Sequence, residues 1–192
     1  MYDQINESLA TIRRFRPIWA ERYTLDSAWK DEQVAAFESL HRCRLPEEYR
    51  DFLLHCGVAG PGPDYGIFAP DQHFPGSGYD ECLGDDPDLG VPFPLSEEWN
   101  YIPEGASNLP DDYFSARHCP GSFMISDRGC ALWGRLIVTG PCAGQIWHDD
   151  RADGWGFRPH IAADGSRYTF LRWYRDWLDA EFYRYGHAGN PK

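Results

Sequence analysis

Residues 119–150 constrain the fold of this chain more than any other stretch. Three short apolar runs follow one another there, FMI, ALWGRLIVT and QIWH, and residues rich in Gly, Pro and Asp separate them. Short strands divided by such residues are typical of an antiparallel β-meander. We therefore expect a turn at residues 127–129, a strand over 130–139, and a third strand that ends at Asp149 and Asp150.

The side chains of the second expected strand divide between two faces, because successive residues of a strand point to opposite sides. One face carries Leu132, Leu136 and Val138, and the other carries Trp133, Arg135, Ile137 and Thr139. The second face mixes polar and apolar residues rather than being purely polar. We expect a helix to cover part of it.

Helical periodicity flanks this meander on both sides. Apolar residues recur at three- and four-residue spacing over 3–15 and 168–183, and Asp26-Ser27 offers a cap for a helix over 28–42. In the run LPEEYRDFLLHCG, Pro46 suits the first helical position and Gly57 suits the end. An edge strand is expected at 65–69 and a further strand at 155–158.

Residues 71–118 are dense in Asp, Gly and Pro and show no sustained period. We expect an ordered insertion there, with one short strand and a helical turn near 96–99. No internal repeat and no flexible linker is visible, so residues 1–192 are expected to form a single domain. The expected fold class is α+β, with a mixed, mainly antiparallel sheet packed by N-terminal helices and a C-terminal helix.

Composition narrows the classes of partner. The net charge of −12 argues against nucleic acid and anionic membranes, which repel an acidic protein, and is compatible with a basic protein partner. No stretch approaches the ~20 apolar residues of a membrane span. The N-terminus lacks the apolar core of a signal peptide, which favours a cytoplasmic protein. The six cysteines contain no CxxC pair, so we expect reduced, buried thiols.

A cysteine hydrolase is one sharper alternative. It would use Cys130 or Cys142 as nucleophile, with His148 and either Asp149 or Asp150. Neighbouring strand residues such as His148 and Asp149 point to opposite sides, which works against such a triad.

Two metal sites are further alternatives. Zinc would draw on His118, Cys119, Cys142 and His148, and calcium on Asp85, Asp86 and Asp88. The spaced ligand pairs of zinc sites and the spaced Asp-Gly-Glu pattern of calcium loops are both absent. We therefore expect no metal and no cofactor.

Several segments together resemble a known family. FESLHRCRLPEEYRDFLLHCG, DYGIFAP, the GC turn before LWGRLIVTGPCAGQIWHDD, and TFLRWYRDWLDAEF come in an order similar to that of the SMI1/KNR4 family. This family belongs to the SUKH superfamily of mainly bacterial toxin-immunity proteins. The resemblance covers about residues 35–185, with 71–118 the poorest match. One departure is His55-Cys56-Gly57, where the family often has a loop that opens with Asn-Gly.

The resemblance implies an α+β domain that binds and neutralises a cognate toxin without catalysis. An intracellular regulatory scaffold of the same fold is the alternative, and a Cys/His-dependent hydrolase is a remote one. We expect a basic toxin domain as partner, with a monomer slightly favoured over an oligomer. The expected contact residues are acidic and aromatic side chains in turn-rich segments: Tyr79, Asp80, Glu81, Asp85, Asp86, Asp88, Asp149, Asp150, Asp153 and Trp155.

Overall fold

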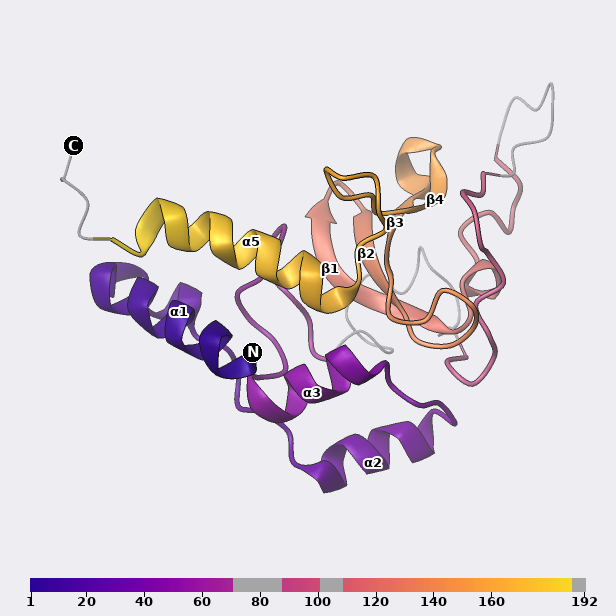
Figure 1. Ribbon diagram of the computed structural model, residues 1–192. Helices are drawn as coiled ribbons and strands as arrows, with labels where there is room; N and C mark the ends of the chain where they lie inside the picture. Colours follow the sequence, from indigo (N-terminus) through magenta and orange to yellow (C-terminus); the bar gives the residue numbers. More distant parts are fainter. Residues whose placement is uncertain (71–87, 101–108, 188–192) are drawn as a thin grey trace.

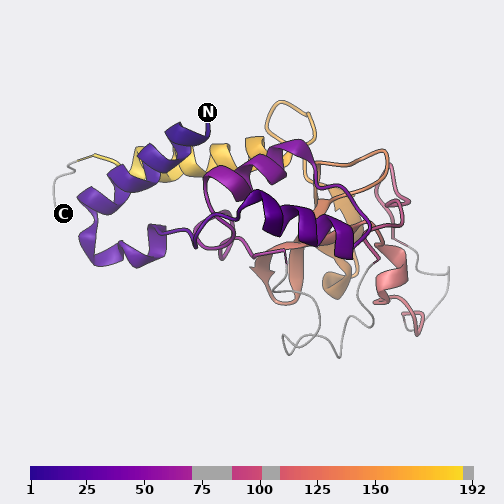
Figure 2. The same cartoon turned by 90° about the horizontal axis from the view of Figure 1, so that it is seen from below.

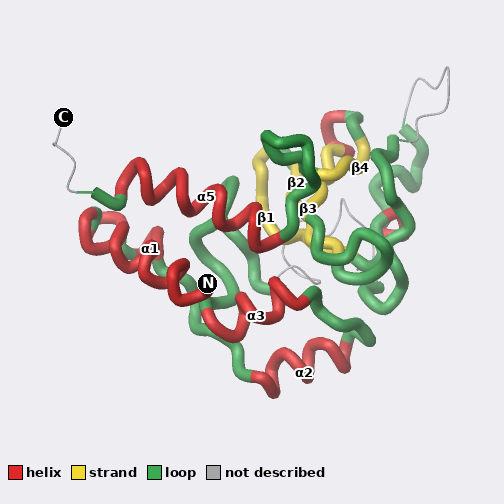
Figure 3. The backbone as a smooth tube through the Cα atoms, viewed as in Figure 1, coloured by secondary structure: helices red, strands yellow, loops and turns green. Residues whose placement is uncertain are grey.

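Three N-terminal helices, a β-meander and a C-terminal helix follow one another along the chain (Figures 1 and 3). The computed structural model describes residues 1–70, 88–100 and 109–187. The helices are α1 (Tyr2–Phe15), α2 (Asp31–Leu40), α3 (Glu47–His55) and α5 (Phe170–Tyr185). The strands are β1 (Ser122–Gly129), β2 (Leu132–Ile137), β3 (Ile146–Asp150) and β4 (Gly156–Pro159). Short 3₁₀ turns are η1 (Pro17–Trp19), η2 (Glu21–Tyr23), η3 (Ala116–His118) and η4 (Arg151–Asp153). The α+β class is confirmed.

The N-terminal helices follow the predicted periodicity. Helix α1 buries Ile5, Leu9 and Ile12, and it ends before Pro17 because the residue before a proline disfavours the helical conformation. Helix α3 buries Tyr49 and its neighbours Phe52 and Leu53.

The start of α2 differs from the prediction. The helix begins after Lys30, whose backbone N–H donates to Gln33 Oε1 at 3.0 Å, and not after Asp26-Ser27. Asp26 N instead donates to the carbonyl of Ala59, and Trp29 N to that of Leu53. These bonds hold residues 26–29 against the chain around α3, so the helix can begin only after them. Pro46 likewise precedes α3 as its cap rather than occupying its first turn.

The four strands form one antiparallel sheet in the order β1-β2-β3-β4, as expected for a meander. All pairings between these strands are antiparallel, so the mixed sheet that we expected is not seen in the described residues. The predicted turn at 127–129 is wrong, since these residues continue β1. The chain reverses at Cys130-Ala131, which have φ angles of 54° and 60°. Positive φ at both central residues is what a tight hairpin turn of this hand requires.

Irregular segments extend the sheet on both sides. Along β1, Tyr65 N donates to Asp127 O and Phe68 N to Ile125 O, both at 3.0 Å. The predicted strand at 65–69 is thus reduced to isolated bridges. Along β4, Trp99 and Phe157 exchange two backbone bonds of 2.7 Å. Residues 96–99 consist of a bend followed by the bridge residue Trp99 and do not form the predicted helical turn.

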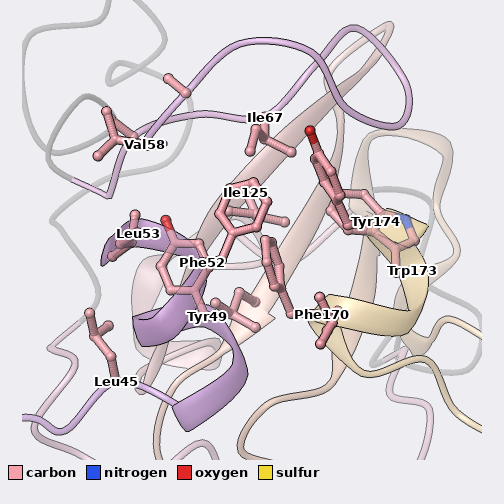
Figure 4. Packing of buried hydrophobic residues seen from close by; sticks show 14 of the residues in the cluster. Leu45, Tyr49, Phe52, Leu53, Val58, Ile67, Ile125, Phe170, Trp173 and Tyr174 are labelled. Carbon is pink, nitrogen blue, oxygen red and sulfur yellow. The ribbon is translucent and has the colours of Figure 1, made fainter. Parts of the chain in front are cut away.

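The core lies between the helices and one face of the sheet (Figure 4). Phe170 of α5 packs edge-to-face on Tyr49 and Phe52 of α3, with ring centroids 4.8 and 5.1 Å apart. Leu136 and Ile125 meet these rings from the sheet. Aromatic rings in this arrangement contribute packing energy beyond their buried area.

The opposite face of the sheet is covered by loops and not by the helix that we expected. A second apolar cluster lies there and consists of Phe93, Cys119, Ile137, Cys142, Trp147 and Phe157. Phe93 comes from an extended segment that donates from its N–H to the carbonyl of Thr139 at 3.0 Å. Both faces of β2 are therefore buried, which explains why neither side of that strand reads as polar.

Helix α5 was predicted over 168–183 and forms over Phe170–Tyr185. It lies beside α1, and the C-terminal ends of both helices point to the same side of the molecule (Figures 1 and 2). Its buried residues include Leu171, Tyr174 and Leu178, whereas Trp177 is only half-buried.

The cysteines of the described chain are free, and they differ in exposure. Cys119 and Cys142 are buried, while Cys43 and Cys56 are intermediate. Cys130 is exposed in the hairpin turn, contrary to our expectation of buried thiols. Cys82 lies outside the described residues. No helix in the described part of the chain is both long and apolar enough to cross a membrane.

Candidate partner-binding surface

Two of the acidic residues that we expected to contact a partner are buried. Asp149 and Asp150 end β3, and each is 2% exposed. Their carboxylates bind arginines of the same chain, so they do not contribute to an open acidic surface. The expectation that they contact a partner therefore does not agree with their position in the fold.

Asp149 lies on the loop-covered face of the sheet between two buried arginines. Both carboxylate oxygens accept from Arg151, at 2.7 and 2.8 Å, and Oδ2 also lies 3.3 Å from Arg135 Nη1. Arg151 Nη1 reaches on to the carbonyls of Tyr113 and Ser115 at 3.1 and 3.2 Å. The group ties β2, β3 and residues 113–115 together. A two-pronged arginine–carboxylate pair fixes geometry as well as charge.

Asp150 points to the opposite face and joins the two outer strands. It pairs with Arg128 of β1 and with Arg158 of β4, where Arg158 Nη2 lies 2.6 Å from Oδ2. The two ion pairs of Asp150 therefore connect the first strand of the sheet to the last. The two neighbouring aspartates thus brace both faces of the same end of the sheet.

The turns above these aspartates form an exposed surface at that end of the sheet, at the top of Figure 1. We name it the sheet-end rim, and it consists of Tyr65, Cys130, Ala131, Asp153 and Trp155. Cys130-Ala131 join β1 to β2, and Asp153 and Trp155 lie between β3 and β4. Both turns fall at one end because Trp133, at the start of β2, pairs with Asp149, at the end of β3.

The rim exposes two large aromatic rings. Trp155 is 66% exposed and Tyr65 is 79% exposed. Trp155 was among the expected contact residues, and its exposure is compatible with that role. Its turn is nonetheless held in place, because Trp155 N donates to Asp150 O at 3.0 Å and Asn100 Nδ2 donates to Gly154 O at 2.6 Å. Neighbouring strands lie about 4.8 Å apart, so the two rings are separated by roughly 15–20 Å, within the width of an ordinary interface.

Asp88 lies far from this rim. It forms an ion pair with Arg42 at 2.7 Å, and its carbonyl accepts from Gly121 N, just before β1 begins. The rim lies at the other end of β1, and eight strand residues span about 25 Å. The two predicted acidic groups therefore do not meet through Asp88. The other predicted residues, Tyr79, Asp80, Glu81, Asp85 and Asp86, lie outside the described residues.

The residues of the alternative hydrolase are not brought together. Cys142 packs in the loop-covered cluster, and its Sγ lies 3.5 Å from Leu95 O. His148 lies on the opposite face, paired in register with Gly134. Cys130 lies in the turn before β2 begins, four residues from Gly134 along the chain. Within the described ranges, no three His, Cys, Asp or Glu side chains are placed to hold a metal ion.

Two histidines lie in contact beside Asp150. The rings of His148 and His160 are 4.2 Å apart, and His160 packs edge-on against Tyr168. Burial, together with the positive charges of Arg128 and Arg158, lowers the pKa of His148 to about 2 and that of His160 to about 4. Both rings are therefore neutral in the folded protein near neutral pH.

This pair predicts a loss of stability on acidification. The unfolded chain binds protons at these histidines near pH 6.5, whereas the folded chain does so only at lower pH. The free energy of unfolding should therefore fall as the pH drops from about 6.5 towards 4. Burial also lowers the pKa values of His41 and His118, which adds to the slope. Urea unfolding between roughly pH 7 and pH 5 should show the fall, and His160→Gln should reduce it. A flat profile would contradict the burial of the pair.

Comparison with known proteins decides the family. The model of the SMI1 / KNR4 family (SUKH-1) matches residues 29–130, which is 102 of the 192 residues. The chain belongs to the SMI1/KNR4 family. The matched part runs from just before α2 to the β1–β2 turn, and it includes α3. No curated protein and no solved structure matches the chain.

The sequence analysis missed two features of this part of the chain, the exposure of Tyr65 and the pairing of the two aspartates with arginines. Tyr65 was assigned only to an edge strand, although it is among the most exposed large side chains. The arginines that neutralise Asp149 and Asp150 were also missed. Arg151 follows the aspartates directly, and Arg135 lies on the mixed face of β2, so an acidic pair beside a strand arginine was the available signal.

Proposed function

We propose that the chain is a cytoplasmic immunity-type protein that neutralises a cognate toxin by binding it directly, and that it is not an enzyme. Membership of the SMI1/KNR4 family supports this proposal, since that family is known for immunity proteins. The observation that carries it is the exposed Trp155 on a turn held by buried ion pairs. A large exposed ring on a turn with a fixed backbone suits a binding hot spot, because the turn loses little entropy when the partner covers it.

Charge supports a basic toxin domain as the partner. The chain carries a net charge of −12, and Asp153 is exposed beside Trp155. An acidic protein attracts a basic partner at long range, which raises the association rate more than the final affinity. Trp155 and Tyr65 would then supply contact area once the two surfaces meet.

Co-expression tests the proposal most directly. The gene next to the one for this chain should encode a toxin domain, and co-expression of the two should restore growth that the toxin alone prevents. Protection without a stable complex would contradict direct binding. A housekeeping operon with no toxin gene would favour the regulatory scaffold instead.

The rim residues make the test specific. Trp155→Ala should weaken binding of the purified toxin domain by about 2 kcal/mol or more, measured by calorimetry. Asp153→Lys should slow association and reduce its dependence on salt, while folding stays intact. Tyr183→Ala is the matched control, because Tyr183 is 83% exposed on α5 and is not one of the rim residues. Equal affinities for the Trp155 and Tyr183 variants would place the interface elsewhere.

A further inference from the structure

The C-terminal ends of α1 and α5 lie side by side at the end of the molecule that is farthest from the sheet, on the left of Figures 1 and 2. There α1 passes into η1 and η2, and Trp19 of η1 packs edge-on against Tyr185 of α5, with ring centroids 5.1 Å apart. We name this end the two-helix tip, and it consists of residues 13–22 and 181–187. It joins the first and last helices of the chain.

The two-helix tip exposes apolar side chains. Ile18 in η1 is 85% exposed and Tyr183 in the last turn of α5 is 83% exposed, the two highest values among the large apolar side chains that the structure describes. Phe15, Trp19 and Tyr185 are half-buried at the same end. A side chain as exposed as Ile18 projects from the surface and does not line a cavity. Apolar side chains gathered at one place on a surface mark an interaction site.

Arginines outnumber acidic residues at the tip. It contains five arginines, Arg13, Arg14, Arg16, Arg22 and Arg184, against two glutamates, Glu21 and Glu181. Of these arginines, only Arg184 forms an ion pair within the described part of the chain, with Glu181 at 3.2 Å. The guanidinium of Arg16 lies 5.9 Å from the ring of Tyr185, so charge and aromatic surface are adjacent. The C-terminal ends of the two helices add about half a negative charge each, which still leaves the tip positive.

The net charge of −12, which argued against anionic membranes, does not cancel this local excess. Charges in water are screened over about 8 Å at physiological ionic strength, whereas the 16 residues of α5 span about 24 Å. The other acidic residues of α5, Asp176 and Asp179, line a pocket with Met1, which precedes α1 at its opposite end. An anionic surface would therefore repel the acidic body of the protein and attract the tip, which turns the tip towards that surface.

We propose that the two-helix tip binds the surface of a membrane that contains anionic lipids. Ile18 and Trp19 would enter the headgroup region, where indole rings are favoured, and the arginines would lie at the phosphates with their alkyl stems against the apolar side chains. A bilayer is soft and needs no matching pocket, which suits a projecting side chain. The cytoplasmic leaflet carries anionic lipids, so such binding agrees with the proposed location. This site goes beyond toxin binding at the rim and does not require it.

Sedimentation with lipid vesicles tests the two-helix tip. The full chain should bind vesicles made of equal parts of phosphatidylglycerol and phosphatidylcholine, and added salt should weaken this binding. Ile18→Asp should lower the partition coefficient by about tenfold or more, because it removes an apolar side chain and adds a charge that the lipids repel. Arg14→Gln should lower it by about fivefold. Leu40→Asp is the matched control for Ile18, since Leu40 is 76% exposed at the end of α2 and lies outside the tip.

Five results would overturn the assignment. They are the absence of binding to the anionic vesicles, equal binding to vesicles of phosphatidylcholine alone, equal losses for the Ile18 and Leu40 variants, release from the vesicles by inorganic phosphate at constant ionic strength, and tighter binding of a short oligothymidylate than of the vesicles. Ile18→Asp should leave toxin binding unchanged, and Trp155→Ala should leave vesicle binding unchanged. Failure of the tip and failure of the rim are therefore distinguishable.

Discussion

Asp149→Asn should lower the free energy of unfolding by about 3–5 kcal/mol. The substitution preserves shape but removes the charge that compensates Arg135 and Arg151, which are 3% and 1% exposed. Both guanidinium groups would remain buried, and removing one partner of a buried ion pair costs far more than the pair contributes. Urea unfolding followed by tryptophan fluorescence measures the loss.

The control for this prediction is Asp153→Asn. Asp153 follows Asp149 in the same part of the chain but is exposed in η4, so its replacement should change stability by less than about 0.5 kcal/mol. Similar losses for both variants would mean that the effect comes from net charge. A small loss at Asp149 would mean that water reaches the arginines.

Phe170→Ala should cost about 3–5 kcal/mol, because it opens a cavity where α3, α5 and the sheet meet. The ring is fully buried and contacts Tyr49, Phe52 and Tyr174. The half-buried Trp177 should cost less when replaced by Ala, although it lies on the same helix. Thermal unfolding of the two variants should show the larger drop in melting temperature for Phe170→Ala.

Tyr183→Ala is the reference for the helix, since its exposed side chain should contribute within about 0.5 kcal/mol. If Phe170→Ala and Tyr183→Ala unfolded at the same temperature, α5 would not be part of the core. If Trp177→Ala showed the largest drop in melting temperature, the main packing contact of α5 would lie at Trp177 and not at Phe170.

The α-helices were predictable because each one carries its own signal. The spacing of Ile5, Leu9 and Ile12 and the position of Pro17 place α1 almost to the residue. The boundaries of α2 were missed for a tertiary reason. Asp26-Ser27 is a good local cap, but backbone bonds to residues beside α3 delay the helix until Asp31.

The site was predicted less well because the exposure of each residue was inferred from its residue type alone. Acidic side chains usually lie in water, so Asp149 and Asp150 were assigned to a surface. The structure reverses this assignment, because arginines from β1, β2, β4 and η4 converge on the two aspartates. Contacts between distant strands cannot be read from local composition.

The sequence by itself determined the α+β class, the three-strand meander and the family, since periodicity and turn residues act over short distances. Only the tertiary structure decided what covers the second face of β2, where the chain reverses at Cys130-Ala131, and which charges are buried. These features depend on residues that are dozens of positions apart, and they meet only when the helices pack on the sheet and bury their apolar faces.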